Sequence, residues 1–568
     1  MRLALAQLNP LVGDLAGNGE LILAACHQAA AQGADLVLTP ELSLWGYPPC
    51  DLLLRPSLIA KQGVVLDQLA ASLTQELPQL AVLVGMAEPS GAATLPNLFN
   101  AVALLEAGSW RVVARKRLLP TYDVFDEQRY FCAATGPSVL ELERGGRSWR
   151  LGLTICEDLW VEEELQGHRL AGADPVAELL SSRIDLLLNL SASPFGQAKV
   201  ALRQSLARRA ASRLACPVVY VNQVGGNDEL VFDGASFVVD ARGGVAAGSA
   251  VVSQLASCKE QVSCWEVNGA APVAPLPTEN EQLFRALVLG VADYARKCGF
   301  SSALLGLSGG IDSALVAVIA AAALGGERVQ ALMMPSPWSS EGSLNDAQEL
   351  AGRLGLGSRT AEIAALMASF DTTLTPVLEG PPSGLSAENL QSRIRGTLLM
   401  AVANQQGQLL LATGNKSELA VGYCTLYGDM NGGLAVIGDL YKTSVFELCA
   451  WLDSVAAGPC RRELGLPGEG ELVGQAIREK PPSAELRPDQ LDSDSLPDYA
   501  VLDPILKAYI EELASPEQLI TSGTPAELAE RVMQLLRRAE FKRRQAPPLL
   551  KIGGRAFGSG WRMPIASF

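Results

Sequence analysis

Short apolar runs alternate with helical patterns through the N-terminal half of the chain. Residues 3–8 and 34–39 are predicted to form strands on either side of a helix at residues 19–32. Further strands are predicted at residues 81–85, 101–105, 111–115, 151–155, 186–190 and 217–222. Several of these runs are apolar throughout, which is typical of strands covered on both faces. The pattern predicts an α/β fold in which mixed sheets form a sandwich flanked by helices.

The C-terminal half repeats the alternation of strand and helix. A buried strand at residues 300–305 leads into a glycine-rich loop and then into an apolar helix at residues 314–324. The next strand is predicted at residues 329–334 and the next helix at residues 344–353. This order predicts a doubly wound parallel sheet with its ligand crevice at the carboxyl ends of the strands.

A segment of different composition joins the two halves. At 568 residues the chain is too long for one hydrophobic core, so two or more domains are expected. Residues 264–277 contain three prolines, which favour an extended connector. After it, Thr278 is the expected N-cap of a helix at residues 278–298 and forms a capping box with Glu281. The predicted divisions are a domain at residues 1–268, a linker at 269–279 and a domain at 280–568.

Composition and charge exclude several classes of protein. Hydrophobic residues make up 48% of the chain and charged residues 19%, which indicates a globular rather than a disordered protein. The net charge of −16 argues against non-specific nucleic-acid binding, which needs a basic face. The apolar runs at the N-terminus and at residues 314–324 are too short for a signal peptide and a membrane span. We therefore expect a cytoplasmic protein without nucleic-acid or membrane partners.

Cysteine and histidine usage limits the chemistry further. The 11 cysteines are scattered without a paired spacing, so reduced thiols are expected rather than disulfides or zinc sites. Only two histidines occur, His27 in a helical pattern and His168 in a charged stretch. Neither is expected to be catalytic, so a nucleophile in this chain needs a base other than histidine.

The loop after residues 300–305 is the clearest motif of the second half. It reads Gly306, Leu307, Ser308, Gly309, Gly310, Ile311, Asp312 and Ser313. Glycines allow a close approach to an anion, while the serines and the N–H groups of the first helical turn donate hydrogen bonds to it. Asp312 would repel a phosphate unless a cation lay between them, so we interpret it as a Mg²⁺ ligand. The loop lacks the lysine of the common P-loop.

Three predicted strand ends carry the chemistry of the first half. They hold Glu41, Lys116 and Cys156, each at the rim of a sheet. The Cys156 thiol must lose its proton to become a nucleophile, and without a suitable histidine a buried Glu41 is the candidate base. Lys116 can stabilise the oxyanion that forms when a thiolate attacks a carbonyl. An inert buried thiol remains the alternative interpretation of Cys156.

The order and neighbours of these residues resemble the nitrilase and amidase superfamily over residues 1–265. Residues 121–131 and 220–229 also fit its glutaminase branch. The resemblance implies an α-β-β-α sandwich with Glu41 as general base, Lys116 as oxyanion stabiliser and Cys156 as the nucleophile that forms a thioester. It further implies that Glu127 orients these three residues and that Tyr122, Ser193 and Lys199 bind L-glutamine. A surface ion pair is the alternative role for Glu127 and Lys199.

The second half resembles the synthetase domain of glutamine-dependent NAD synthetases, which are ATP pyrophosphatases with an adenine nucleotide alpha hydrolase-like fold. The similarity is closest at residues 308–313, 389–396, 413–418, 481–486 and 542–548. It implies ATP binding by the loop at residues 306–313 and by Thr413, with Mg²⁺ on Asp312 and Glu418. Deamido-NAD contacts would fall on Asn389, Arg393, Glu418 and Lys542. Trp338 departs from the family pattern, which has Tyr or Phe at this position.

Together the two resemblances imply a ligase that adenylates deamido-NAD with ATP and then amidates it with ammonia from glutamine. A shielded passage for ammonia is expected, because free ammonia is mostly NH₄⁺ at neutral pH. A homo-oligomer is expected from the family, and the acidic, proline-rich residues 478–497 are expected to order over substrate. The alternatives are another glutamine-dependent adenylating ligase and an amidase fused to a module that binds ATP without chemistry.

Overall fold

The computed structural model describes residues 1–241, 250–269 and 271–566. The chain divides into two compact units, Met1–Pro277 and Thr278–Phe568. None of the helices within the described ranges has the length and apolar character that a bilayer span requires.

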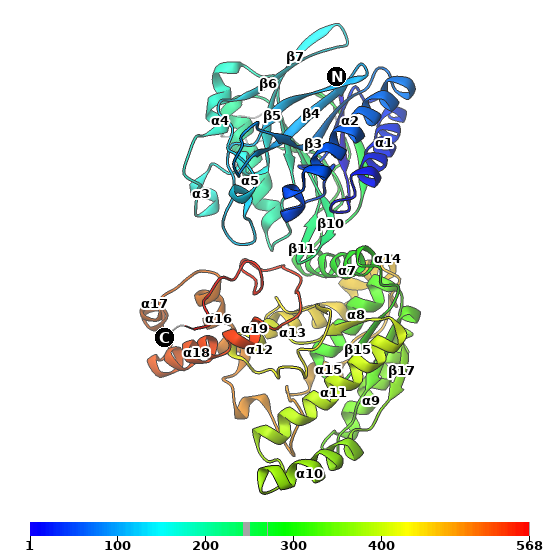
Figure 1. The fold of residues 1–568 in the computed structure, drawn as a ribbon, viewed down its shortest axis with the longest axis vertical. Helices are drawn as coiled ribbons and strands as arrows, with labels where there is room; N and C mark the ends of the chain where they lie inside the picture. The colour runs from blue at the N-terminus through cyan, green and yellow to red at the C-terminus, as the bar shows by residue number, and fades with distance from the viewer. Residues whose placement is uncertain (242–249, 270, 567–568) are drawn as a thin grey trace. The chain divides into compact units, whose positions relative to one another are not determined.

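The first unit contains two six-stranded mixed sheets (Figure 1). The first runs in the order β14 (Gln261–Glu266), β1 (Arg2–Gln7), β2 (Leu36–Leu38), β3 (Ala81–Pro89), β4 (Leu98–Glu106) and β5 (Ser109–Arg115). The second runs β13 (Val251–Gln254), β12 (Phe237–Val239), β9 (Val218–Asn222), β8 (Leu186–Ser191), β7 (Arg147–Ile155) and β6 (Ser138–Arg144). In each sheet three parallel strands lie at the centre, and antiparallel strands lie on both sides of them. A separate hairpin pairs β10 (Val224–Asn227) with β11 (Leu230–Asp233).

The two sheets pack face to face and helices cover their outer faces. Leu3 and Leu5 of β1 belong to one core cluster with Leu188 and Leu190 of β8, which fills the space between the sheets. The alternate residue Ala4 packs with residues of α1 (Leu15–Ala31) and α2 (Pro56–Glu76). On the other sheet, strand residues pack with α4 (Pro175–Glu178) and α5 (Lys199–Leu214). These strands are therefore buried on both faces, and the predicted α-β-β-α sandwich is confirmed.

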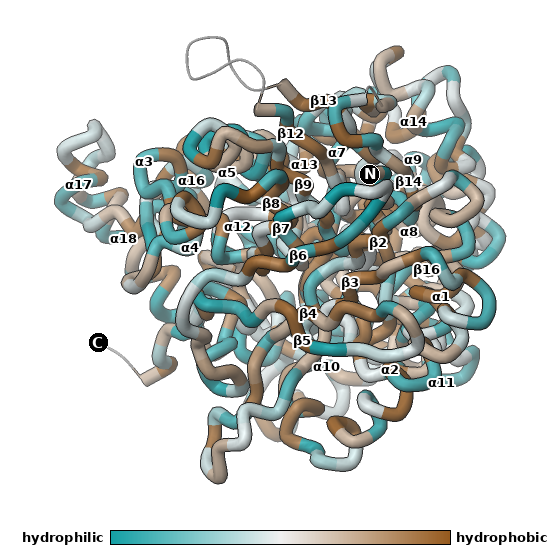
Figure 2. The backbone as a smooth tube through the Cα atoms, turned by 90° about the horizontal axis from the view of Figure 1, so that it is seen from above, coloured by the Kyte–Doolittle hydropathy of each residue, from teal (hydrophilic) through white to brown (hydrophobic). Residues whose placement is uncertain are grey.

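The second unit is built on a five-stranded, fully parallel sheet. Its order is β17 (Gly357–Thr360), β16 (Val329–Met333), β15 (Ala303–Gly306), β18 (Leu409–Ala412) and β19 (Leu434–Ala435). The helices around it include α7 (Glu279–Lys297), α8 (Ile311–Leu324), α9 (Glu341–Leu354), α10 (Ala364–Leu378), α11 (Leu385–Gln406), α12 (Lys416–Val421), α13 (Lys442–Leu452) and α16 (Tyr499–Ile510). Figure 2 shows hydrophobic residues along central strands such as β8 and β2, as expected of sheets covered on both faces. The predicted doubly wound parallel sheet is confirmed.

Some local predictions need correction. Helix α1 begins at Leu15 rather than at residue 19, because the Asp14 carboxylate accepts a hydrogen bond from the Gly17 N–H at 3.0 Å. Thr278 caps α7 as predicted, but the Glu281 carboxylate pairs with Arg285 at 2.8 Å, so the predicted capping box is wrong. Residue 270 of the proposed linker lies outside the described residues.

Candidate active sites

Glu41 reaches the sheet rim through a tight turn after β2. The turn approaches β3 so closely that a Cβ at Gly85 would lie 2.3 Å from the Leu42 nitrogen and 2.4 Å from the Pro40 oxygen. Glycine is thus required at residue 85 for the turn to pack there. Glu41 is 1% exposed. Its two oxygens accept hydrogen bonds from the Asn100 amide at 2.7 Å and from the Ala192 N–H at 3.0 Å.

Lys116 lies between two carboxylates. Its Nζ is 2.7 Å from Glu41 Oε1 and 2.7 Å from Glu127 Oε1. Burial opposes the lysine charge, but Glu127 and Glu41 outweigh it and raise the pKa of Lys116 well above its ordinary value. The Tyr47 hydroxyl donates to Glu127 Oε1 at 2.8 Å, and burial raises the pKa of Glu127 to about 7. The structure therefore brings the predicted Glu41, Lys116 and Glu127 together, with the Lys116 ammonium group between the two carboxyl groups.

Cys156 occupies a strained turn at the end of β7. Its φ of 44° lies in the left-handed region, which favours glycine. Burial and the nearby Glu41 raise the pKa of the thiol well above its ordinary value, so Cys156 stays protonated at neutral pH. One residue missed by the sequence, Asp158, fixes this turn: its carboxylate accepts from the N–H groups of Ile155 (3.1 Å), Arg117 (3.0 Å) and Leu118 (2.9 Å). Asp158 thereby ties the ends of β5 and β7 together.

Of the three residues predicted to bind glutamine, Tyr122 and Lys199 contact residues that follow Cys156 in this turn. The Tyr122 hydroxyl is 3.1 Å from both carboxylate oxygens of Glu157, and Lys199 Nζ lies 5.6 Å from the centre of the Trp160 ring. Ser193 is buried and donates its N–H to Asn222 Oδ1 at 2.8 Å. The sequence alone assigns no role to Glu157, although its position directly after Cys156 marks it as a neighbour of the site. Burial raises the pKa of Glu157 to about 7.

The histidines lie at the surface of this unit. His27 is paired with Glu76 at 2.9 Å, and the exposed His168 ring packs edge-on against Tyr122 at 5.2 Å.

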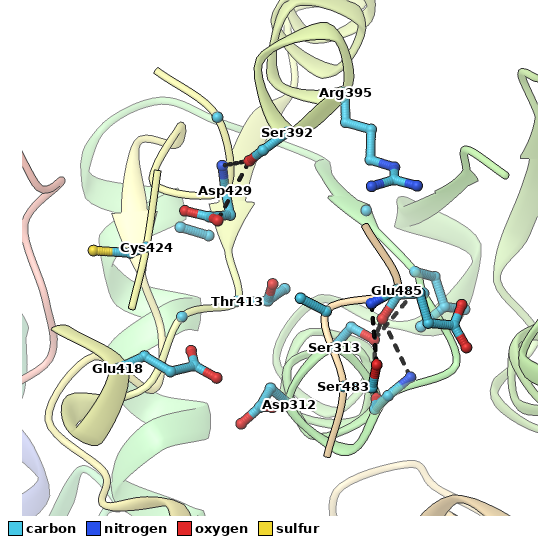
Figure 3. A pocket seen from close by; sticks show the side chains of 18 of the residues that line it. Asp312, Ser313, Ser392, Arg395, Thr413, Glu418, Cys424, Asp429, Ser483 and Glu485 are labelled. Carbon is cyan, nitrogen blue, oxygen red and sulfur yellow. Dashed lines mark hydrogen bonds between the residues drawn. The ribbon is translucent and has the colours of Figure 1, made fainter. Parts of the chain in front are cut away.

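The second unit contains a cavity of about 300 Å³ at the carboxyl ends of its strands (Figure 3). The predicted ATP-site residues that line it are Gly306, Leu307, Ser308, Gly310, Ile311, Asp312, Ser313 and Thr413. Gly309 does not line the cavity, but its carbonyl accepts a hydrogen bond from Lys480 Nζ at 3.3 Å. The exposed Trp338 is not among the lining residues of this cavity either.

The loop before α8 has the backbone geometry of an anion site. Gly309 has a φ of 80°, and a Cβ there would lie 2.1 Å from the Ser343 oxygen. The hydroxyl oxygens of Ser308 and Ser313 are 3.1 Å apart, and no side chain caps the N-terminus of α8. The N–H groups of its first turn are thus available to an anion, and the helix dipole favours negative charge there.

Asp312 and Glu418 lie on one side of the cavity, from α8 and α12 respectively (Figure 3). Lys442 Nζ contacts Asp312 Oδ2 and lies 3.5 Å from Glu418 Oε1. Asn415 caps α12, and its amide also donates to Asp312 Oδ1 at 3.0 Å. Burial and the Asp312 charge raise the pKa of Glu418 to about 8. The structure thus brings together the two residues predicted to bind Mg²⁺, with a lysine between them.

The other residues predicted to contact deamido-NAD are not among those that line this cavity. In the structure they form hydrogen bonds with residues 422–426. Asn389 Oδ1 accepts from Thr425 Oγ1 at 2.9 Å, and Arg393 Nε donates to the Leu426 oxygen at 3.2 Å. Lys542 Nζ donates to the oxygens of Gly422 and Cys424, both at 2.7 Å. The next residue, Arg543, is buried and bonded to Glu540 at 2.8 Å.

The chain matches two known families in sequence order. The carbon-nitrogen hydrolase family matches residues 2–254, and the NAD synthase family matches residues 283–546. Over 569 aligned residues it is 49% identical to the glutamine-dependent NAD(+) synthetase of Synechocystis sp., covering 99% of this chain and 98% of that protein. The chain belongs to the glutamine-dependent NAD(+) synthetases.

Other glutamine-dependent NAD(+) synthetases are also similar to this chain over its full length. The protein of Thermotoga maritima is 40% identical over 100% of this chain and 98% of its own length. The solved structure of the Acinetobacter baumannii glutamine-dependent NAD(+) synthetase in complex with ADP superposes with a TM-score of 0.74 at 38% identity, over 99% of this chain and 98% of that one. The family, the fold class and the assignment as a ligase that the sequence predicted are therefore confirmed.

Proposed function

We propose that this glutamine-dependent NAD(+) synthetase adenylates the nicotinate carboxylate of deamido-NAD with ATP and then amidates it. The adenylation releases pyrophosphate, and ammonia displaces AMP to give NAD. Ammonia comes from glutamine, which is hydrolysed to glutamate. The observation that carries the proposal is that one chain holds both a buried Glu41–Lys116–Cys156 group and a phosphate loop facing two carboxylates.

In the first unit, Glu41 accepts the thiol proton while Cys156 Sγ attacks the amide carbon of glutamine. The proton must move during the attack, because the raised pKa of Cys156 keeps the resting thiol neutral. Lys116, which is 1% exposed and held by two carboxylates, stabilises the oxyanion. As the tetrahedral intermediate collapses, Glu41 gives this proton to the amide nitrogen, the C–N bond breaks, and ammonia leaves. Water activated by Glu41 then cleaves the thioester to glutamate and restores the thiol.

We assign the charged ends of glutamine to the groups next to Cys156. Glu157, which is 5% exposed and close to Tyr122, is suited to the α-ammonium group, and Lys199 is suited to the α-carboxylate. Ser193 and Tyr122 complete the site with hydrogen bonds. Glu127 keeps Lys116 in place through its 2.7 Å contact.

In the second unit, ATP phosphates bind the loop at residues 306–313 and the N-terminus of α8, with Thr413 on the opposite wall. The carboxylates of Asp312 and Glu418 suit a hard cation, since the charge of one raises the pKa of the other. Among the described residues no set of three or more His, Cys, Asp or Glu side chains forms a metal cluster, so a Mg²⁺ ion on these two would complete its oxygen ligands with phosphate and water. When bound, Mg²⁺ would neutralise charge on the phosphates.

Deamido-NAD is assigned to the part of the cavity bordered by Tyr423 and Cys424. We propose that Asn389, Arg393 and Lys542 serve this substrate by fixing the segment 422–426, since each bonds to it. Glu418 borders the same space.

The remaining assignments concern the whole protein. An ammonia passage is proposed on chemical grounds, because protonated ammonia is no nucleophile. A homo-oligomer is proposed because α10 has no buried residue yet carries exposed Leu366, Phe370 and Val377. The cytoplasm is proposed as the compartment, because the 11 cysteines of the sequence are scattered without the paired spacing of a disulfide framework.

The deciding experiment measures NAD formation from deamido-NAD, ATP and Mg²⁺ with glutamine or ammonium as donor. Cys156→Ala should lose the glutamine-driven reaction and keep the ammonium-driven one. Cys26→Ala, a buried thiol in α1, is the matched control and should keep both. If the native protein makes no NAD from either donor but releases pyrophosphate with another carboxylate, a different adenylating ligase is indicated. If it releases no pyrophosphate with any acceptor, the second unit only binds nucleotide.

A further inference from the structure

Lys442 holds the two proposed metal-binding carboxylates at specific oxygen atoms. It begins α13, its side chain is 3% exposed, and its Nζ contacts Asp312 Oδ2 and approaches Glu418 Oε1 at 3.5 Å. The Lys442 backbone N–H is fixed separately, since it donates to Ser417 Oγ at 2.9 Å. The ammonium group is therefore not needed to hold the start of the helix.

Asn415 engages the other oxygen of each carboxylate. Its Nδ2 donates to Asp312 Oδ1 at 3.0 Å, and its backbone N–H donates to Glu418 Oε2 at 3.2 Å. The oxygens left for a cation are Asp312 Oδ2 and Glu418 Oε1, the two that Lys442 contacts. A divalent cation bound by both carboxylates would compete with the lysine for these atoms.

A third carboxylate lies near this pair. Asp492 lines the same cavity and accepts a hydrogen bond from the Tyr499 hydroxyl at 3.0 Å. The neighbouring Lys416 is engaged elsewhere, at 2.8 Å from Asp439 and 2.7 Å from Glu511. Lys442 is thus the lysine that places a positive charge directly at the two oxygens that a cation would need.

We propose that Lys442 makes divalent-cation binding dependent on nucleotide. This inference rests on the proposed metal role of Asp312 and Glu418. Without nucleotide, the lysine occupies the cation-binding oxygens. When a nucleotide binds the adjacent loop, its phosphates attract the ammonium group and release those oxygens. Metal and nucleotide then favour each other's binding by the same factor.

The test measures Mn²⁺ binding by electron paramagnetic resonance, with and without the α,β-methylene analogue of ATP. Native protein should bind Mn²⁺ weakly alone and tightly with the analogue. Lys442→Met should bind Mn²⁺ alone at least about tenfold more tightly than native, because a nearby positive charge is gone. With the analogue present, the variant should show no such gain, since the lysine has already left the oxygens in the native protein.

Three further variants separate the causes. Lys442→Arg keeps the charge and should behave as native. Lys507→Met, at an exposed lysine on α16, should also behave as native. Asp312→Asn combined with Lys442→Met should lose the gained affinity. Circular-dichroism melting checks folding, and Lys442→Gln replaces the methionine variant if that one is unfolded.

The outcomes are distinct. The inference is overturned if the native and Lys442→Met proteins bind Mn²⁺ equally tightly without nucleotide. It is also overturned if Lys442→Met raises the Mn²⁺ affinity by the same factor with and without the analogue. If the native protein binds no Mn²⁺ even with the analogue, the proposed metal site itself is wrong. NAD formation in the same preparation shows separately whether the proposed reaction stands.

Discussion

The hydroxyl oxygen of Tyr122 lies 3.1 Å from each carboxylate oxygen of Glu157. This contact places a buried acid beside Cys156, with the aromatic ring of Tyr122 packed against Phe125 at 5.6 Å. The phenol donates to the carboxylate, and the pair carries a negative charge once Glu157 is ionised, above its pKa of about 7. Next to the proposed nucleophile, such a charge would favour a substrate that carries a cationic group close to its reacting amide.

Glu157→Gln should therefore weaken glutamine use without affecting the synthetase unit. Hydrogen bonds to charged groups contribute about 1.5–3 kcal/mol, so kcat/KM for glutamine should fall by about 10–100-fold. NAD formation with ammonium should be unchanged. The matched control is Glu164→Gln, an exposed carboxylate in the same unit. A native-like kcat/KM for glutamine in Glu157→Gln would rule out this assignment.

The glutamine-driven reaction should lose activity on the acid side of neutrality. Glu127 and Glu157 both have a pKa of about 7, raised mainly by burial. Below this pH they become protonated, so Lys116 loses one carboxylate contact and glutamine loses its counter-charge. A plot of kcat/KM for glutamine against pH should fall between pH 8 and pH 6.

Tyr47→Phe should move that acid limb to higher pH. The Tyr47 hydroxyl donates to Glu127 and lowers its pKa, so removing the hydroxyl should raise the pKa further. An acid limb that stays in place in this variant would show that Glu127 does not control it.

Gly309→Ala should strongly slow adenylation. A methyl group at this position would meet the Ser343 backbone oxygen at 2.1 Å, and the φ of 80° adds strain. Displacing the loop by about 1 Å should reduce ammonium-driven NAD formation by about 100-fold. Gly299→Ala has a similar φ of 82° but no atom within 4 Å of the new Cβ, so it should keep its activity. Equal activities of the two variants would contradict the role of the loop.

Glu418→Gln should stabilise the protein at alkaline pH while NAD synthesis is lost. The pKa of Glu418 is raised from 4.5 to about 8, so the protonated carboxyl favours folding, and this stability is lost as the pH rises across that range. The variant has no group to ionise at this position. The difference between its free energy of unfolding and that of the native protein should therefore increase by about 2–4 kcal/mol from pH 5 to pH 9. Thermal melts at both pH values would test this, and a constant difference would contradict it.

The sequence predicted the residues whose position follows from regular structure. Glu41 and Lys116 follow strands of the first sheet, Cys156 follows a strand of the second, and apolar runs in the sequence mark these strands. The loop at residues 306–313 was similarly marked by its glycines and by the helix that follows it.

The residues that the sequence did not predict act through contacts between segments that are distant along the chain. Lys442 contacts Asp312 across 130 residues, and Asp158 bonds backbone groups of the segment after β5. No local pattern encodes such pairs. Asn389 and Lys542, for which the resemblance predicts contacts with deamido-NAD, both bond to residues 422–426, and only tertiary packing reveals these bonds.

The arrangement of Glu41, Lys116, Glu127 and Cys156 also makes the glutaminase site a probe of refolding. The four side chains come from four separate stretches of the first unit, and Lys116 is held only when β2, β5 and the turn carrying Glu127 are all in place. In partly folded chains with native-like secondary structure, Lys116 would be hydrated and the pKa of the Cys156 thiol would not be raised by burial. Recovery of glutamine hydrolysis after dilution from denaturant should therefore lag behind the recovery of helix and strand content.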